Sequence, residues 1–238
     1  SVQRMDGAGS PTGNPVILFG GAATDQLIAS GDMNGDGAND LVFRKLDGSN
    51  TYEVVYLNAN GTILGRKTYN PGGTDWRLVG VYDQNLDGYV DLVWQNVATG
   101  RLIIWYMKAD GTRDSFVTMV SSVANYRIAA VGDLNADGLM DLLWQKVTGD
   151  STELRVWYLD ANGATSSQKA LATVTGGYRC VGLADYNSDN VNDIVWQRVS
   201  SGQVVAWYMS PTGAHTGTKV LSTGDPDQLV SNWQWDLS

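Results

Sequence analysis

An acidic loop of nine residues occurs four times in the 238-residue chain at nearly constant spacing. The loops begin at Asp32, Asp83, Asp133 and Asp185, so successive copies start 51, 50 and 52 residues apart. Units of about 20 to 50 residues cannot bury an apolar face alone, and they gain a core by stacking against further copies. The spacing therefore predicts one architecture built from several equivalent units.

Each loop is followed by runs that are typical of short β-strands. The first run reads DLVFR, DLVWQ, DLLWQ or DIVWQ, and after a turn the second contains YEVVYL, RLIIWYM, ELRVWYL or QVVAWYM. A second turn, a less regular strand and a short apolar run lead into the next loop. Four antiparallel strands in about 50 residues, without helical periodicity, are the content of a propeller blade. We predict an all-β fold, a β-propeller.

The short run before each loop is expected to lie innermost, because it carries a small residue at one fixed place. Small side chains suit strands that crowd around a central axis. Cys180, the only cysteine, stands in this run where other copies have Leu27, Leu78 and Ile128, so we expect a buried apolar role. The small residues are Ala29, Gly80, Ala130 and Gly182.

The two ends of the chain each resemble part of a unit. The tail DQLVSNWQWDLS is similar to DQLIASGDMNGDGANDLV without its acidic loop, and the head SVQRMDGAGSPTGNPVILFGG is similar to VAWYMSPTGAHTGTKVLSTGD. We predict a single propeller domain over residues 1–238 with five blades, the fifth split between residues 1–26 and 225–238. Shared termini close the ring and leave no open sheet edge. The alternative is a fragment of a ring with six or seven blades.

Charge and composition exclude several kinds of partner and site. The formal net charge is −9 and no basic tract is present, which argues against nucleic acid and against anionic membranes. No apolar stretch approaches the roughly 20 residues of a membrane-spanning helix. One cysteine and one histidine exclude disulfides, cysteine-built zinc sites and multi-histidine metal sites. His215 lies in the turn-like PTGAHTGT, where we expect an exposed residue rather than part of a Ser/His/Asp triad.

The acidic residues are concentrated in the loops and are almost all aspartate. Only Glu53 and Glu153 are glutamates among 25 acidic residues, and twelve aspartates occupy the loops DMNGDGAND, DQNLDGYVD, DLNADGLMD and DYNSDNVND. All four fit D-x-N-x-D-[GN]-x-x-D. Side-chain oxygens at positions 1, 3, 5 and 9 and the carbonyl at position 7 can surround one ion, and position 6 turns the backbone sharply. Such hard oxygen donors favour Ca²⁺ over Mg²⁺ and over transition metals.

Two other calcium motifs with this opening do not fit. An EF-hand needs a bidentate glutamate at position 12, and a dockerin-like loop needs an aspartate there. The remaining alternative is four acidic turns without metal, in which clustered carboxylates repel and raise one another's pKa. Position 12 is occupied by Phe43, Trp94, Trp144 and Trp196.

The unit resembles the FG-GAP or VCBS-type repeats of integrin α-subunit propellers, of secreted bacterial proteins and of some propeller lectins. The resemblance rests on G-D-x-N-x-D-G-x-x-D-[IL]-[VL]-W followed by V-x-W-Y-M, and it covers residues 25–224 better than the ends. It implies four structural Ca²⁺ sites and none in the fifth blade. Asn190 departs from the glycine at position 6 but tolerates a left-handed conformation. The implied ligands are Asp32, Asn34, Asp36, Ala38 (carbonyl), Asp40, Asp83, Asn85, Asp87, Tyr89 (carbonyl), Asp91, Asp133, Asn135, Asp137, Leu139 (carbonyl), Asp141, Asp185, Asn187, Asp189, Val191 (carbonyl) and Asp193.

Aromatic residues recur at fixed places in the units. Packing between blades is the first interpretation, because each ring buries a large area, and pockets that stack on a sugar are the alternative. The columns are Trp94, Trp144 and Trp196, and Trp105, Trp157 and Trp207.

A further column places an aromatic residue beside an arginine at the start of the innermost run, and it is our candidate ligand-binding site. The alternative is that the arginines bridge to an acidic loop of the next blade. Blade 1 has Asp25-Gln26 at this place and the tail has Asp227-Gln228. Glutamine also recurs at one place, and the sequence does not predict which way these side chains face. The residues are Gln95, Gln145 and Gln197. The pairs are Trp76-Arg77, Tyr126-Arg127 and Tyr178-Arg179.

Three classes of function remain. The first is a non-catalytic binding module for carbohydrate recognition or adhesion, with a glycan or protein ligand at the rim or between blades. The second is a structural or protein-interaction propeller within a larger protein. The third is a glycoside-active enzyme, which needs paired carboxylates beside the substrate. Glu53 and Glu153 lie out of register in outer strands, so we expect no enzyme.

The expected calcium requirement favours a secreted or cell-surface location, extracellular or periplasmic. The lack of disulfides is compatible with a bacterial origin. Ser1 at the first position indicates a mature or excised piece.

Overall fold

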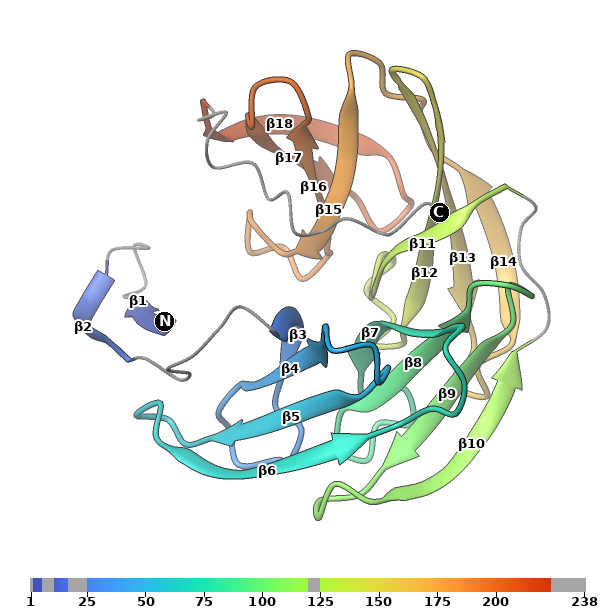
Figure 1. The fold of residues 1–238 in the computed structure, drawn as a ribbon. Coiled ribbons are helices and arrows are strands. Elements are labelled where there is room, and N and C mark those ends of the chain that lie inside the picture. Colours follow the sequence, from blue (N-terminus) through green and yellow to red (C-terminus); the bar gives the residue numbers. More distant parts are fainter. Residues whose placement is uncertain (1, 6–10, 17–24, 120–124, 224–238) are drawn as a thin grey trace.

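The computed structural model describes residues 2–5, 11–16, 25–119 and 125–223, with side chains described from residue 25 onward (Figure 1). Four antiparallel sheets have four strands each, and we name them blades 1 to 4 in chain order. Blade 1 contains β3 (Asp25–Gly31), β4 (Asp40–Lys45), β5 (Tyr52–Leu57) and β6 (Ile63–Tyr69). Blade 2 contains β7 (Trp76–Tyr82), β8 (Asp91–Asn96), β9 (Leu102–Met107) and β10 (Arg113–Met119). Blade 3 contains β11 (Arg127–Gly132), β12 (Asp141–Thr148), β13 (Ser151–Leu159) and β14 (Thr165–Ala170). Blade 4 contains β15 (Tyr178–Ala184), β16 (Asp193–Arg198), β17 (Val204–Met209) and β18 (His215–Ser222).

The blades are arranged around a common axis. Figure 1 shows the first strand of each blade toward the middle of the molecule and the fourth strand at the outside. The innermost strands of successive blades contact one another, β3 with β7, β7 with β11 and β11 with β15. Up-and-down sheets repeated radially in this way are a β-propeller. The predicted fold class and the four-stranded blade are confirmed.

The number of blades differs from the prediction. The described residues form four blades, not five. Residues 25 and 26, which we assigned to the fifth blade, belong to β3 because they pair with β4 of blade 1. Two further strands, β1 (Val2–Met5) and β2 (Pro11–Val16), pair with each other, and Figure 1 places them on the open side between blades 1 and 4. Residues 225–238 lie outside the described residues, so closure of the ring stays a prediction.

Each innermost strand has a β-bulge at the same place. The register with the second strand shifts immediately before the small residue, for example between Leu78 and Gly80. Bulges bend a strand and re-aim its side chains. All four bulged residues line a central cavity of about 310 Å³. They are Ile28, Val79, Ala129 and Val181.

The small residue after the bulge marks a close approach between blades. A Cβ atom added at Gly80 of β7 would lie 2.0 Å from Cγ2 of Val131 in β11. No side chain fits at that separation, so the proposed reason for a small residue is confirmed at this interface.

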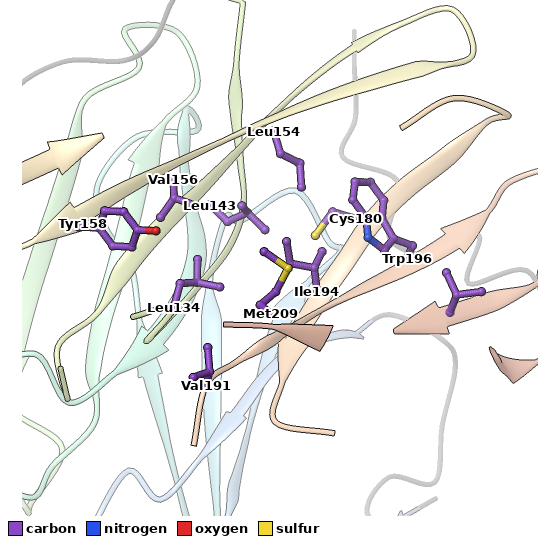
Figure 2. Packing of buried hydrophobic residues seen from close by; sticks show 11 residues of the cluster. Leu134, Leu143, Leu154, Val156, Tyr158, Cys180, Val191, Ile194, Trp196 and Met209 are labelled. Atoms are coloured by element: carbon purple, nitrogen blue, oxygen red, sulfur yellow. The ribbon is translucent and has the colours of Figure 1, made fainter. Parts of the chain in front are cut away.

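Apolar side chains form one core cluster at each interface between described blades. In β12, Leu142 packs toward blade 2 and Leu143 toward blade 4. Figure 2 shows the cluster between blades 3 and 4, where Leu143 and Val156 meet Ile194 and Trp196. Successive residues of one strand therefore enter different cores, which explains why the strands are apolar on both faces.

The tryptophan columns pack inside these interfaces. Trp94, Trp144 and Trp196 are fully buried, and each lies about 5 Å from the second tryptophan of its own blade, centroid to centroid. Packing is therefore the confirmed role of the first column. Cys180 is buried in the cluster of Figure 2 and forms no disulfide, and burial raises the pKa of its thiol to about 12. His215 is exposed as predicted but begins β18 instead of lying in a loop, and its ring stacks on Trp207.

A second contact between blades lies at the outer edge. The turn between β9 and β10 packs onto blade 1, where Tyr69 donates a hydrogen bond to the carbonyl of Gly111 over 2.8 Å. The equivalent turn of blade 4 packs onto blade 3, and a Cβ atom at Gly213 would lie 2.7 Å from the Tyr158 hydroxyl. Neighbouring blades are therefore held at the axis, through the core and at the rim.

Gly80→Ala is expected to destabilise the protein by about 1–3 kcal/mol, because the added methyl group overpacks the β7–β11 contact. The control is Gly65→Ala in β6, where no described atom lies within 4 Å of the added Cβ. Urea unfolding of both variants measures the difference, and equal midpoints contradict the close approach.

Candidate metal-binding loops

The four acidic loops fold in the same way, each around its first aspartate. In loop 1 the carboxylate of Asp32 accepts hydrogen bonds from the amides of Gly35, Asp36 and Gly37 over 2.8, 3.1 and 2.8 Å. Amides that converge on one carboxylate hold a tight turn. The first aspartates of the other loops accept the amides of positions 5 and 6 in the same way; they are Asp83, Asp133 and Asp185.

Positions 3 and 5 meet beside that aspartate. Asn34 donates its side-chain amide to Oδ2 of Asp36 over 3.1 Å, and its Oδ1 accepts the Asp36 backbone amide over 3.0 Å. The side-chain oxygens of positions 1, 3 and 5 therefore gather on the exposed side of the loop. The same two bonds join Asn85 to Asp87, Asn135 to Asp137 and Asn187 to Asp189.

Position 9 lies beneath the loop and links it to the third strand. Asp141 is fully buried, and its two carboxylate oxygens accept the amides of Leu134 in the loop, over 2.8 Å, and of Leu159 at the end of β13, over 3.2 Å. Each position-9 aspartate therefore joins its loop, the start of the second strand and the end of the third. The other three position-9 aspartates accept the equivalent two amides in their own blades and have no exposed surface. They are Asp40, Asp91 and Asp193.

Burial favours the protonated form of the carboxylates of Asp40, Asp91 and Asp141, because desolvation raises their pKa. Desolvation raises the pKa of Asp91 to about 6 and that of Asp141 to about 7, although the two amides bonded to each lower it. The carboxylates at positions 1 and 5 of the same loop raise the pKa further. The negative charge of loops 2 and 3 is therefore incompletely compensated by the protein itself.

The backbone is left-handed at two places in every loop. At position 6 the φ angles are +82° at Gly37, +89° at Gly88, +83° at Gly138 and +65° at Asn190, as predicted. At position 4 the φ angles are also positive, although Leu86, Ala136 and Ser188 are not glycines. A left-handed residue with a side chain costs about 1–2 kcal/mol, so the hydrogen bonds of the loop must hold position 4. The motif gave no signal for this strain.

Neighbouring loops are joined by a residue that sequence reasoning missed. Gln84 at position 2 of loop 2 is fully buried, and its Oε1 accepts the amide of Met140 in loop 3 over 3.0 Å. Its Nε2 donates to the carbonyl of Asp160 in the β13–β14 turn over 3.0 Å. A polar residue among apolar ones at position 2 was the available signal, since the other loops have Met33, Leu134 and Tyr186 there.

The donor set of the loops fits a hard cation in part. Positions 1, 3 and 5 bring two carboxylates and one amide oxygen together, whereas the position-9 carboxylate is held by two buried amides. Within the described residues no three His, Cys, Asp or Glu side chains converge closely enough to hold an ion without rearrangement. Each carboxylate oxygen keeps a second lone pair for a further partner. The chemistry of the donors therefore suits Ca²⁺ if the position-9 side chain or a water completes the shell.

Residues 83–144 match the family model of the FG-GAP-like repeat. This span runs from the first residue of loop 2 through β8 to β11 and into β12, so it joins two blades of the propeller. Residues 83–144 therefore carry an FG-GAP-like repeat. The resemblance drawn from the sequence is confirmed. Loops 1 and 4 lie outside the matched span and have the same hydrogen-bond pattern as loops 2 and 3. A comparison with curated proteins found no match.

The aromatic–arginine pairs lie at the end of the blades opposite the FG-GAP loops. Arg179 donates to the carbonyls of Tyr178 and Gly149 over 2.9 and 3.1 Å and to Oγ1 of Thr152 over 3.2 Å. Arg77 reaches Asn50 of blade 1 in the same manner. These two arginines therefore contact the preceding blade and not an acidic loop.

The tyrosines of the pairs are held by polar neighbours. Tyr126 donates to Glu153 over 2.8 Å and accepts from Arg155, whose guanidinium carbon lies 5.2 Å from the ring centre. Tyr178 donates to Gln203 over 2.6 Å, and Arg198 stands 5.8 Å from its ring centre. Each ring therefore has a cation near one face and is fixed in place.

Gly88→Ala is expected to lower the free energy of unfolding by about 1–2 kcal/mol, because a left-handed φ disfavours a Cβ atom. No described atom lies within 4 Å of that Cβ, so the cost is conformational. Gly88→Asn, which copies Asn190 of loop 4, is the control and is expected to cost less. Thermal unfolding compares the two, and an asparagine variant as unstable as the alanine variant contradicts the conformational explanation.

Asp141→Ala is expected to destabilise the protein by about 3 kcal/mol, because two buried amides lose their acceptor at about 1–3 kcal/mol each. Asp141→Asn keeps one acceptor oxygen, so its free energy of unfolding is expected to lie between those of Asp141→Ala and the parent protein. Unfolding in guanidinium chloride with EDTA present measures the stability of both variants without a contribution from bound metal. Wild-type stability of Asp141→Ala contradicts the structural role of the carboxylate.

Proposed function

We propose that the protein is a non-catalytic binding module in which each FG-GAP loop binds one Ca²⁺ in a structural role. The supporting observation is that all four loops gather the oxygens of positions 1, 3 and 5 on one turn through the same hydrogen bonds. These carboxylates repel one another, and a divalent cation offsets that repulsion. The proposed ligands are the side chains at positions 1, 3, 5 and 9 with the carbonyl at position 7.

Bound calcium would stabilise more than its own loop. The position-9 aspartate connects each loop to the third strand, and Gln84 connects loop 2 to loop 3. Binding energy that favours the folded loop adds to the folding energy of the blade. We propose that calcium sets the stability of the whole propeller.

Calcium titration tests this proposal. The expected stoichiometry is four ions per chain, and saturation is expected to raise Tm, because ligand that binds only the folded state stabilises it. Asp137→Asn is expected to remove one site and to reduce the gain in Tm. Isothermal titration calorimetry counts the sites.

The control for that experiment is Asp47→Asn, which removes the same charge from an exposed turn of blade 1. It is expected to leave the stoichiometry unchanged. Identical melting curves with EDTA and with saturating calcium contradict the structural role.

We also propose that a fifth blade, made from both termini, closes the ring. Support comes from blade 1, where Leu41, Phe43, Val55 and Leu57 form a buried cluster without residues from another described blade. In blades 2 to 4 the residues at these places pack against the preceding blade. By analogy, the buried cluster of blade 1 is expected to pack against a preceding blade. Figure 1 places β1 and β2 on the side of blade 1 that faces away from blade 2.

The proposed ligand is a carbohydrate, with adhesion as the biological role. Support comes from the aromatic–arginine pairs, which repeat Trp76, Tyr126 and Tyr178 in three successive blades at one end of the propeller. Repeated sites give avidity toward a multivalent glycan. A structural or protein-interaction propeller in a larger secreted or cell-surface protein is the alternative, because the pairs also bond neighbouring strands.

A glycan array is expected to show binding that is lost in EDTA, because the loops that hold the blades together need calcium. Tyr178→Ala is expected to weaken that binding several-fold, since stacked rings contribute about 0.5–1.5 kcal/mol each. Phe116→Ala, an exposed ring on β10, is the control. The absence of binding to any glycan on a broad array contradicts carbohydrate recognition and favours the protein-interaction alternative.

A catalytic role has little support among the carboxylates outside the loops. Glu53 is buried with Lys45 and Arg66 at 3.1 and 3.0 Å, and Glu153 pairs with Lys146 at 3.1 Å. Hydrogen bonds from Tyr126 and Lys146 lower the pKa of Glu153, which disfavours a role as general acid.

The described residues include no helix long and apolar enough to span a membrane. We propose a secreted or cell-surface location from the calcium requirement.

A further inference from the structure

The central cavity of the propeller has an unusual charge for an acidic protein. Its described lining comes mainly from the four innermost strands, with Arg44, Tyr52 and Val97 from other positions, and it includes three arginines and no lysine, aspartate or glutamate. The chain as a whole carries a formal net charge of −9. Positive charge is therefore concentrated where the blades meet. The arginines are Arg44, Arg77 and Arg127.

One level of the ring keeps an arginine–glutamine pair in every described blade. In blades 2, 3 and 4 the arginine is on the innermost strand and the glutamine faces it from the second strand, as in Arg127 and Gln145. In blade 1 the two residues are exchanged, so Gln26 is innermost and Arg44 faces it. The exchange keeps a guanidinium at this level although the residue moves to the other strand.

In the part of the chain that the structure describes, the three cavity arginines have no carboxylate partner. None of them takes part in an ion pair between described residues. Arg77 donates only to neutral oxygens, including the carbonyl of Trp76 over 3.0 Å. The Nε atom of Arg44 is buried without a hydrogen-bond partner. Arg44 and Arg77 are half-buried. Partly desolvated charge without a counter-ion is costly, so a mobile anion is favoured at this place.

Two of the cavity arginines lie beside Tyr52: Arg44 is its partner across β4 and β5, and Arg77 lines the same cavity. Burial raises the pKa of the Tyr52 phenol, and the charges of Arg44 and Arg77 both oppose that rise. Tyr52 itself is a cavity-lining residue, and its hydroxyl accepts the amide of Leu78 over 3.4 Å. The Tyr52 hydroxyl in turn donates to the carbonyl of Trp76 over 3.4 Å, and Arg77 donates to the same carbonyl. Arg44 and Arg77 therefore face one wall of the cavity on either side of a tyrosine whose hydroxyl is already hydrogen-bonded.

The remaining wall is apolar. The four bulged residues, which include Ile28, Val79 and Val181, line the cavity beyond the arginine level. A volume of about 310 Å³ is at the lower end of small-molecule pockets, which hold about 300–1,000 Å³. The space suits a small ligand with an anionic group at one end and an uncharged body at the other.

We propose that the central cavity binds a small oxyanionic ligand through Arg44, Arg77 and Arg127. Arginine presents several N–H donors in a fork that matches the oxygens of a carboxylate, sulfate or phosphate group. The group is either a free inorganic oxyanion or the acidic substituent of a sugar. This site is separate from the FG-GAP loops and does not depend on calcium binding there. It uses Arg77 and Arg127 of the aromatic–arginine pairs, whereas the glycan proposal rests on the aromatic rings of those pairs.

Isothermal titration calorimetry of the full chain at constant ionic strength tests the proposal. Sodium sulfate and sodium glucuronate are the probes, and glucose is the neutral comparison. Saturable binding of sulfate or glucuronate without glucose binding is expected. Tighter binding of glucuronate assigns the site to an acidic sugar, and tighter binding of sulfate assigns it to an inorganic oxyanion.

Two variants locate the site. Arg127→Gln is expected to raise Kd at least about tenfold, because a charge-assisted hydrogen bond is lost. The side chain of Arg127 is exposed and forms no hydrogen bond or ion pair with a described residue, so its replacement is expected to leave the fold intact. Arg101→Gln removes the same charge from an exposed position before β9, outside the cavity, and is expected to leave Kd unchanged.

Three outcomes overturn the proposal. One is the absence of saturable binding for both oxyanions. The second is a Kd that rises equally in Arg101→Gln and Arg127→Gln, which assigns the effect to net charge. The third is an unchanged Kd in Arg127→Gln while the Tm of that variant in chloride equals the Tm of the parent protein.

Discussion

The hydrogen bonds of the last aspartate in each acidic loop determine how a blade is built. This residue starts the second strand, and its carboxylate reaches the loop on one side and the end of the third strand on the other. An aspartate without exposed surface is costly unless its oxygens are satisfied, and two backbone amides satisfy them here. The outward loop geometry, with oxygens gathered at positions 1, 3 and 5, depends on this anchor.

The blades in turn depend on one another and not on a shared centre. Each described interface has its own apolar cluster, and a strand such as β12 supplies alternate residues to two of them. Contacts run between neighbours at the axis, in the core and at the outer turns. Stability in such an array is a sum over units and nearest-neighbour interfaces. A fully buried glutamine, Gln84, adds a polar connection to one of these interfaces.

The features that could be predicted from the sequence are those carried by a unit on its own. Strand number, the acidic loops, the left-handed position 6 and the burial of Trp94, Trp144 and Trp196 follow from local chemistry and repetition. The bulges, the left-handed Leu86, the contacts of Arg77 and Arg179 and the role of Gln84 arise from contacts with a neighbouring strand or blade. A repeat shows what recurs, but it does not show which surface a recurring residue meets. The fifth blade was inferred from weak similarity at both ends, and its C-terminal part lies outside the described residues.

The position-9 aspartates also give every blade its own spectroscopic reporter. The backbone N–H that each one binds belongs to the last residue of the third strand, and the four N–H groups are chemically similar yet separately assignable. Amide exchange at these sites reads the opening of one blade at a time. The order in which the blades come apart can thus be followed in a single isotopically labelled sample. The four reporters are the amides of Leu57, Met107, Leu159 and Met209.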